Sequence, residues 1–179
     1  MATLVSPGGK LEATFDPRAG MRGTSLRHHG EELLAPGGIP LLYPWANRLA
    51  AFDYVALGKH VELDRESGLL ELDQNGLPIH GLLREWGAWD LEDGDGALTA
   101  GLNFGNQEKL LKAFPFPHTL RLDLRLQGSH LSIATSVAAD QGEDVPVSFG
   151  FHPYFRLPDA PREEWEIELP VRERLCWTT

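Results

Sequence analysis

Residues 119–137 read TLRLDLRLQGSHLSIATSV, and this stretch decides the fold class. Leucine alternates with polar or charged residues up to position 126, and after a Gly-Ser pair the same period of two continues to Val137. Successive side chains of a strand point to opposite faces, so each segment can bury one face and wet the other. The stretch predicts two antiparallel strands joined by a tight turn. A leucine-rich helix is the competing interpretation, but the strict alternation and the turn favour strands.

Similar patterns continue on both sides of this hairpin. Two more hairpins are predicted, from 54–57 to 60–63 and from 86–92 to 98–104, each across a turn that contains glycine. Only 106–113 has a short helical signal, while the 19 glycines and 13 prolines fall at strand-like intervals. These features predict one all-β domain, built as an antiparallel sandwich or barrel.

The composition is that of a soluble globular protein, with 42% hydrophobic and 23% charged residues. The net charge of -10 disfavours nucleic acid and membranes as partners, because both attract clustered Lys and Arg. No stretch approaches the roughly 18 apolar residues of a membrane helix, and the start of the chain does not resemble a signal peptide. The single cysteine, Cys176, lies between apolar residues, which favours a packed thiol over a nucleophile. We therefore expect a cytoplasmic, soluble protein.

Residues 147–158, VSFGFHPYFRLP, place a histidine among aromatic residues. Pro153 disfavours helical backbone at His152, which predicts an extended conformation at a strand end with a fixed ring direction. Histidine is the side chain best suited to move protons near neutral pH, so His152 is a candidate catalytic acid or sugar-binding group. The alternative is a structural histidine buried at the strand end.

A second motif, PLLYPWANRL at 40–49, reads as a strand entering a loop with Asn47 and Arg48 at its tip. The Arg48 guanidinium can grip neighbouring hydroxyls or a carboxylate, and Asn47 adds a donor and an acceptor. Tyr43 and Trp45 would supply apolar platforms suited to a sugar face. For Arg48, the alternative is a surface arginine that closes a turn.

A third motif, QNGLPIHGLLREW at 74–86, has an Asn-Gly turn signal before His80. Gly81 follows, and a glycine there lets backbone or ligand approach closely. Arg84 and Trp86 are predicted on alternate positions of a strand, so that His80 would stand beside a cation and an aromatic wall. The alternative is a histidine satisfied by a turn carbonyl.

Two histidines and an arginine at apparent strand ends suit proton transfer on a hydroxyl or a hemiacetal better than peptide hydrolysis. The sequence has no serine nucleophile elbow and no glycine-rich phosphate or dinucleotide motif, which argues against kinases and dehydrogenases. The histidines lack the spacing of metal ligands, although these residues alone leave a metal site open.

In order and spacing, the three motifs resemble those of the aldose 1-epimerase (mutarotase) family. The resemblance covers essentially the whole chain and is carried by LYPWANR at 42–48, NGLPIHG at 75–81 and GFHPYF at 150–155. It implies a large antiparallel β-sandwich of the galactose mutarotase type. It also implies interconversion of the α and β anomers of an aldose, with a small sugar as partner and with no metal or cofactor. The oligomeric state stays open.

The resemblance also implies a role for each motif residue. His152 looks like the general acid that protonates the ring oxygen. His80 looks like the second active-site histidine, which binds the sugar and steadies charge on the reacting oxygens. Arg48 and Asn47 look like ligands of sugar hydroxyls, and Trp86 looks like a wall of the pocket.

This sequence departs from the family pattern at the general base, which in the family is a glutamate near the end of a longer chain. The alternation in 165–169 predicts a strand with its glutamates on the solvent face. Residues 1–179 therefore look like a single β-sandwich domain that is incomplete at its carboxyl end. Two alternatives stay open. One is a hexose 6-phosphate 1-epimerase with Arg84 as a candidate phosphate ligand, and the other is a non-catalytic carbohydrate-binding module. The late glutamates outside the base motif are Glu163, Glu164, Glu166, Glu168 and Glu173.

Overall fold

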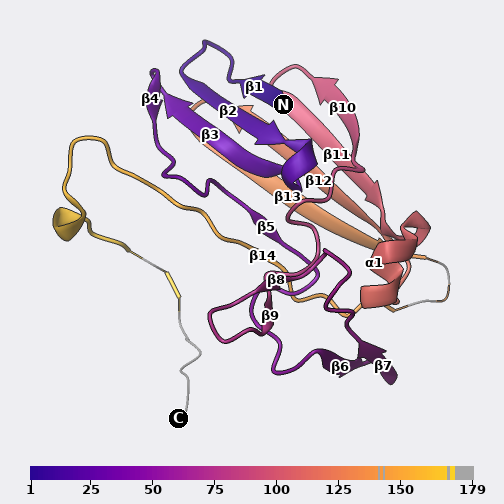
Figure 1. Cartoon of the computed structure of the whole chain (residues 1–179). Coiled ribbons are helices and arrows are strands. Elements are labelled where there is room, and N and C mark those ends of the chain that lie inside the picture. The colour runs from indigo at the N-terminus through magenta and orange to yellow at the C-terminus, as the bar shows by residue number, and fades with distance from the viewer. Residues whose placement is uncertain (141, 143, 169, 172–179) are drawn as a thin grey trace.

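Two four-stranded antiparallel sheets form the main layers of the computed structural model, which describes residues 1–140, 142, 144–168 and 170–171 (Figure 1). Each sheet joins strands that follow one another along the chain, as hairpins with short connections do. The first sheet contains β1 (Ala2–Val5), β2 (Leu11–Asp16), β3 (Arg22–His28) and β4 (Glu31–Glu32), in that order. The second contains β10 (Asp90–Gly94), β11 (Ala97–Asn103), β12 (His118–Gln127) and β13 (His130–Ala139), in that order.

Three short ladders, each of two antiparallel strands, lie outside the large sheets. Two of them are local hairpins, whereas the third joins segments that are about a hundred residues apart in the sequence. The hairpins pair β6 (Asp53–Ala56) with β7 (Lys59–Glu62), and β8 (Glu71–Leu72) with β9 (Pro78–Ile79). The long-range ladder pairs β5 (Leu41–Leu42) with β14 (Gly150–Phe151).

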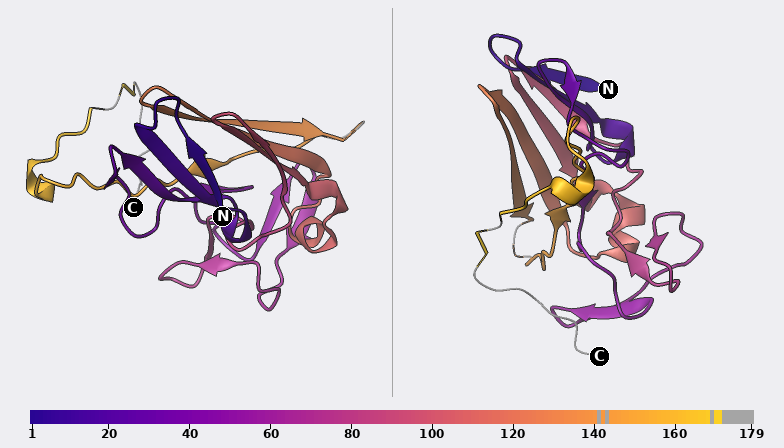
Figure 2. Two further views of the ribbon diagram at one scale, coloured as in Figure 1. Left: turned by 90° about the horizontal axis from the view of Figure 1, so that it is seen from above. Right: turned by 90° about the vertical axis from the view of Figure 1, so that its left-hand side faces the viewer.

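The two large sheets pack as layers, and their inner faces form the core (Figure 2). The hairpin predicted over 119–137 is confirmed, because β12 and β13 pair along their whole length. Alternate residues of β12 and of β2 are buried in one hydrophobic cluster, as face-to-face sheet packing requires. The all-β sandwich expected from the sequence is therefore confirmed. The buried side chains of the two strands are Leu120, Leu122, Leu124, Leu126, Leu11, Ala13 and Phe15.

The helical signal at 106–113 is confirmed as a short helix, α1 (Glu108–Ala113), preceded by a 3₁₀ turn at Phe104–Asn106. Further 3₁₀ turns occupy Pro17–Ala19 and Arg162–Glu164. In the described part of the chain, no helix has the length and apolar character that crossing a membrane requires.

The strand predicted over 86–92 is partly wrong, because regular pairing begins only at Asp90. The Trp86 amide donates to the Leu83 carbonyl at 3.1 Å and closes a turn. Arg84 lies within this turn, so Arg84 and Trp86 do not occupy alternate positions of a strand. The turn explains the missing strand, because it uses the Trp86 amide and the Leu83 carbonyl, which a strand would offer to a neighbouring strand.

The strand predicted over 165–169 is wrong within the described residues. No ladder includes these positions, and the Trp165 indole donates to the Ala160 carbonyl at 3.0 Å. Ile167 is 78% exposed, so alternation in this segment buries no apolar face. The final residue of the segment and Cys176 lie outside the described residues.

A buried histidine ties the loop after β5 to the core. His118 is fully buried, and its Nε2 lies 2.6 Å from the Tyr43 hydroxyl, while its Nδ1 contacts the Phe116 carbonyl. The Phe104 ring stacks on the imidazole with centroids 4.4 Å apart. Burial lowers the pKa of His118, because the charged imidazolium loses its hydration, and this outweighs the Phe116 carbonyl and Asp140, which favour the charge.

The lowered pKa of His118 predicts a loss of stability in mild acid. Unfolded His118 binds its proton near pH 6.5 and the folded form only at lower pH, so the unfolded state holds more protons between these values. The free energy of unfolding should therefore fall as the pH drops below about 6.5. Urea titrations from pH 8 to pH 5 should show a shallower fall for His118→Gln. The exposed control His130→Gln should follow the wild type. Equal pH slopes for all three proteins would contradict this account.

Candidate active site

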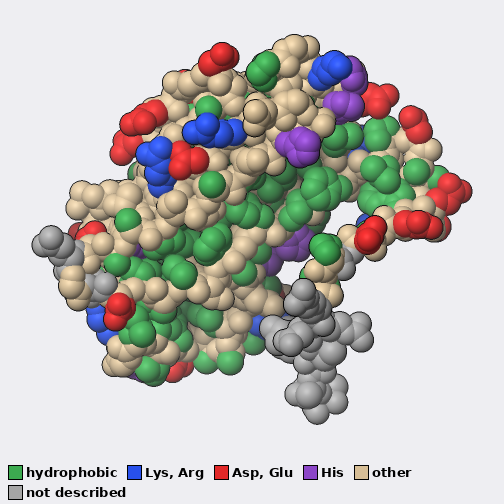
Figure 3. All heavy atoms as spheres, turned by 180° about the vertical axis from the view of Figure 1, so that it is seen from behind, with side chains coloured by type: hydrophobic (Ala, Val, Ile, Leu, Met, Phe, Trp, Pro, Cys, Tyr) green, Lys and Arg blue, Asp and Glu red, His purple; other side chains and the backbone are tan. Residues whose placement is uncertain are grey.

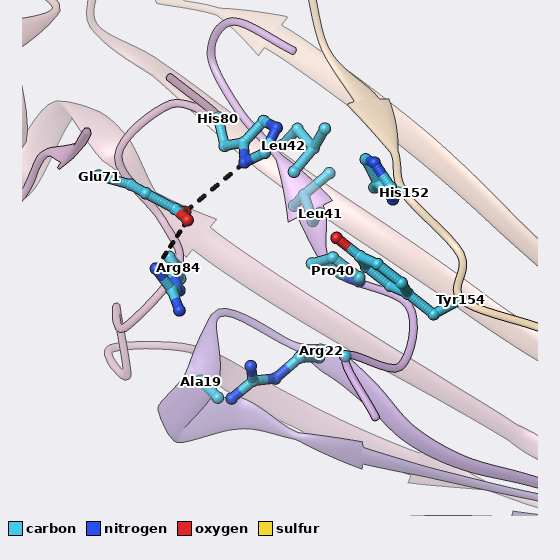
Figure 4. A pocket seen from close by; sticks show the side chains of 11 residues that line it. Ala19, Arg22, Pro40, Leu41, Leu42, Glu71, His80, Arg84, His152 and Tyr154 are labelled. Carbon is cyan, nitrogen blue, oxygen red and sulfur yellow. Dashed lines mark ion pairs between the residues drawn. The ribbon is translucent and has the colours of Figure 1, made fainter. Parts of the chain in front are cut away.

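The two histidines singled out in the sequence meet in one pocket. The His80 and His152 ring centroids lie 5.9 Å apart, with the rings inclined by 67°. The pocket has a volume of about 110 Å³ and lies where the β5–β14 ladder meets the end of β9 (Figure 4). Its polar lining consists of Arg22, Glu71, His80, Arg84, His152 and Tyr154.

His152 is positioned by the long-range ladder. It follows β14 directly, and its amide donates to the Pro40 carbonyl at 3.1 Å, which continues the pairing with the chain before β5. The Tyr154 ring stacks on its imidazole, with centroids 4.6 Å apart and planes inclined by 20°. Tyr154 is held by its own amide, which donates to the Gly38 carbonyl at 2.8 Å. The predicted strand end and aromatic neighbour are both present.

His80 is positioned by an unusual backbone conformation. Its φ of 64° is in the left-handed region, which a histidine rarely adopts, and Gly81 follows with φ 77°. A Cβ atom at Gly81 would lie 2.0 Å from the Tyr43 carbonyl oxygen, so only glycine allows this approach. The same carbonyl accepts the Leu82 amide at 2.7 Å. The close backbone approach expected at Gly81 is therefore confirmed. It fixes the backbone position from which the His80 side chain projects.

Glu71 connects His80 to Arg84. One carboxylate oxygen lies 3.6 Å from His80 Nδ1, and the other lies 2.8 Å from Arg84 Nη1 (Figure 4). The sequence motifs do not single out Glu71. The signal that could have found it is the turn at 73–76, since the β8–β9 hairpin pairs Glu71 with Ile79, the residue before His80. Two histidines, a carboxylate and an arginine around a hollow can bind hydroxyls and exchange protons with them.

A family model described as "Aldose 1-epimerase" matches residues 22–175, which include all of these pocket residues. The chain belongs to the aldose 1-epimerase family. No curated protein sequence matches it significantly.

Solved structures agree with this family assignment at the level of the fold. A "galactose mutarotase related enzyme" from Lactobacillus acidophilus superimposes with a TM-score of 0.70 at 21% identity, over 88% of this chain and 50% of that one. A putative aldose 1-epimerase from Escherichia coli gives 0.65 at 21% identity, over 87% and 51%. A galactose mutarotase-like protein from Lactobacillus casei gives 0.67 at 24% identity, over 86% and 50%. The chain spans about half the length of the solved structures that it matches.

Arg48 and Asn47, the sugar ligands implied by the epimerase resemblance, do not line the pocket. Arg48 Nε lies 3.0 Å from a carboxylate oxygen of Asp73, and Asn47 Oδ1 accepts the Arg48 amide at 2.8 Å. Hydrogen bonds to the Asp73 carboxylate, led by the Leu77 amide and aided by the Asn75 amide, lower the pKa of Asp73. In this arrangement Arg48 braces the turn between β8 and β9, the hairpin that carries Glu71 and ends at His80.

The aromatic residues predicted to face a sugar lie elsewhere. Tyr43 and Trp45 are 0% and 7% exposed and belong to the core, so their assignment as sugar platforms is wrong. Trp86 is half-buried, packs against the core and does not line the pocket. Tyr154 supplies the aromatic wall instead, and Arg84 does line the pocket as expected.

The molecular surface has regions of different character. Seen from behind, hydrophobic side chains gather over the middle of the face, and acidic side chains follow the extended arm after β14 (Figure 3). That arm includes Asp159, Glu163 and Glu164, all exposed. Within the described residues, no cluster of three or more His, Cys, Asp or Glu side chains has the arrangement of a metal site.

Proposed function

We propose that this chain catalyses the interconversion of the α and β anomers of an aldose. The observation that carries the proposal is the pair of imidazoles, His80 and His152, whose rings face one hollow at a centroid distance of 5.9 Å. Membership of the aldose 1-epimerase family supports the same reaction. Anomer exchange requires one group that gives a proton and one that takes a proton, placed on either side of a hemiacetal.

In the proposed reaction, His152 protonates the ring oxygen of the sugar while the anomeric hydroxyl loses its proton. The ring opens to the aldehyde, and rotation about the adjacent carbon–carbon bond lets it reclose on either face. His80 holds the reacting oxygens and steadies their charge. Tyr154 stacks on His152 and limits the directions in which its ring can present the proton. Arg84 offers donors to the sugar hydroxyls.

Optical rotation tests this proposal directly. Freshly dissolved α-glucose and α-galactose relax slowly in buffer, and the purified protein should accelerate the relaxation in proportion to its concentration. Sugar affinity measured in parallel separates an epimerase from a non-catalytic carbohydrate-binding module. Binding without acceleration would favour the binding module and overturn the enzymatic proposal.

An aldose with an anionic group is a second candidate substrate, and Arg22 favours it. Arg22 is half-buried, lines the pocket together with Arg84, and makes no ion pair within the described part of the chain. Planar guanidinium groups form two parallel hydrogen bonds with phosphate or carboxylate.

Glucose 6-phosphate should then be turned over with a lower KM than glucose. Arg22→Gln should raise that KM about tenfold or more, while the exposed Arg18→Gln should not. Equal KM values for the two sugars would leave the neutral aldose as the substrate.

A further inference from the structure

A second hollow lies between α1 and the segment that follows β7, and it shares no lining residue with the histidine pocket. Its volume is about 200 Å³, below the roughly 300 to 1,000 Å³ of sites for drug-sized ligands, so it suits a smaller molecule. Its floor is apolar, because the lining side chains of Leu63 and Ala113 are buried and those of Leu69 and Leu70 are half-buried.

Hydrogen bonds hold both walls of this hollow. The Tyr54 hydroxyl donates to the Ala113 carbonyl at 2.6 Å, which fixes the β6–β7 hairpin against the end of α1. In the facing segment, the Asp64 carboxylate accepts the Glu66 amide at 2.9 Å and closes a turn. The hollow is therefore already formed in the free protein, which reduces the entropy lost when a ligand binds.

Opposite charges line the two sides of the hollow. Lys109 and Lys112 are three positions apart on α1, so they share one face of the helix. Glu108 pairs with Lys112 at 2.9 Å, whereas none of the ion pairs found among the described residues includes Lys109. Glu62 and Asp64 supply carboxylates from the segment opposite α1. A ligand with one positive and one negative group can therefore form charge-assisted hydrogen bonds with both sides.

We propose that this hollow binds a free apolar α-amino acid, of which L-leucine is an example. Its side chain lies on the apolar floor, and its carboxylate pairs with Lys109. Its ammonium group donates to Asp64, because a carboxylate can accept further hydrogen bonds besides the one from the Glu66 amide. A sugar fits less well, since no aromatic ring is found among the described lining residues for its face to stack on. The inference goes beyond the proposed anomer exchange and does not depend on it.

Four small probes test the separate parts of this ligand. L-leucine has both charges and the apolar side chain, whereas 4-methylpentanoate lacks the ammonium group, 3-methylbutylamine lacks the carboxylate and glycine lacks the side chain. NMR titrations of the nitrogen-15-labelled protein measure each dissociation constant. L-leucine should bind about tenfold or more tightly than each of the other three. Equal affinity for any of these three, or no saturable binding of L-leucine, would overturn the proposal.

Lys109→Gln and Asp64→Asn test the two charged contacts. Each should raise the dissociation constant of L-leucine about tenfold or more, while an asparagine at position 64 can still accept the Glu66 amide. Lys10→Gln is the matched control, because Lys10 is an exposed lysine between β1 and β2 that does not line the hollow. It should keep the wild-type affinity, and a wild-type affinity in Lys109→Gln would refute the assigned contact.

The same titrations show where L-leucine binds. The backbone amide signals of residues 62–70 and 109–113 should shift as L-leucine is added, because these segments line the hollow. Shifts confined to the segments around His80 and His152 would place L-leucine in the histidine pocket and overturn the proposal. Since no turnover is measured, failure of this inference and failure of the proposed anomer exchange are distinguishable.

Discussion

Replacing His152 with alanine is expected to slow anomer exchange on the order of 10²- to 10⁴-fold, the usual contribution of a general acid. The imidazole is the donor proposed for the ring oxygen, and water cannot replace it at a fixed position and angle. The loss should appear in kcat, because the side chain is required when the ring bond breaks. Stopped-flow polarimetry with a freshly dissolved α-anomer measures it.

His130→Ala is the matched control for this experiment. His130 is an exposed histidine at the start of β13, so its removal changes the same residue type at a distance from the pocket chemistry. His130→Ala should retain the wild-type rate, and circular dichroism should show that both variants keep the β-sheet spectrum. A His152→Ala protein with the rate of His130→Ala would exclude His152 as the acid.

Gly81→Ala is expected to cause a large loss of stability. The new Cβ would lie 2.0 Å from the Tyr43 carbonyl oxygen, and the backbone would keep a φ of 77° that L-residues disfavour. Backbone strain and the forced shift of the Tyr43 backbone should together cost about 3 kcal/mol or more of unfolding free energy. Urea denaturation measures this cost as a lower midpoint.

Gly58→Ala separates strain from steric overlap. Gly58 has a φ of 76°, almost that of Gly81, but an added Cβ there would meet no atom within 4 Å. This control should lose only about 1 kcal/mol, the cost of a left-handed alanine. If both variants lost the same stability, contact with the Tyr43 carbonyl would play no part.

The long strands of the sandwich can be predicted from the sequence because their burial alternates with period two. In β12, each buried leucine is followed by a half-buried or exposed residue, so pattern and structure coincide over ten residues. The ladders around the site contain two residues each, too few for any periodicity to show. The position of β5 also depends on a partner far along the chain, since Leu41 pairs with Phe151.

The residues of the candidate site likewise divide into those that the sequence predicts and those that it does not. His80, His152 and Arg84 can be predicted because glycine, proline and aromatic residues mark their surroundings. Glu71 is marked only indirectly, by the turn between β8 and β9, and Arg22 carries no such mark, since the packing of the first sheet brings it to the pocket. Tyr43 was predicted wrongly, because an aromatic residue of a motif beside a loop can equally well form the wall of a binding site or belong to the core.

The anchoring of the backbone at the two pocket histidines has a consequence for how the sugar specificity of the proposed site can be changed. Backbone hydrogen bonds from Leu82 to Tyr43 and from His152 to Pro40 anchor the segments that carry these histidines, so the fold itself sets where both side chains begin. Arg22 is half-buried, Arg84 is 52% exposed, and neither takes part in these two hydrogen bonds. If the proposed function holds, these arginines can be exchanged to suit another sugar while the proposed catalytic pair stays in place. In that case, sugar specificity and the anchoring of the backbone are carried by separate residues.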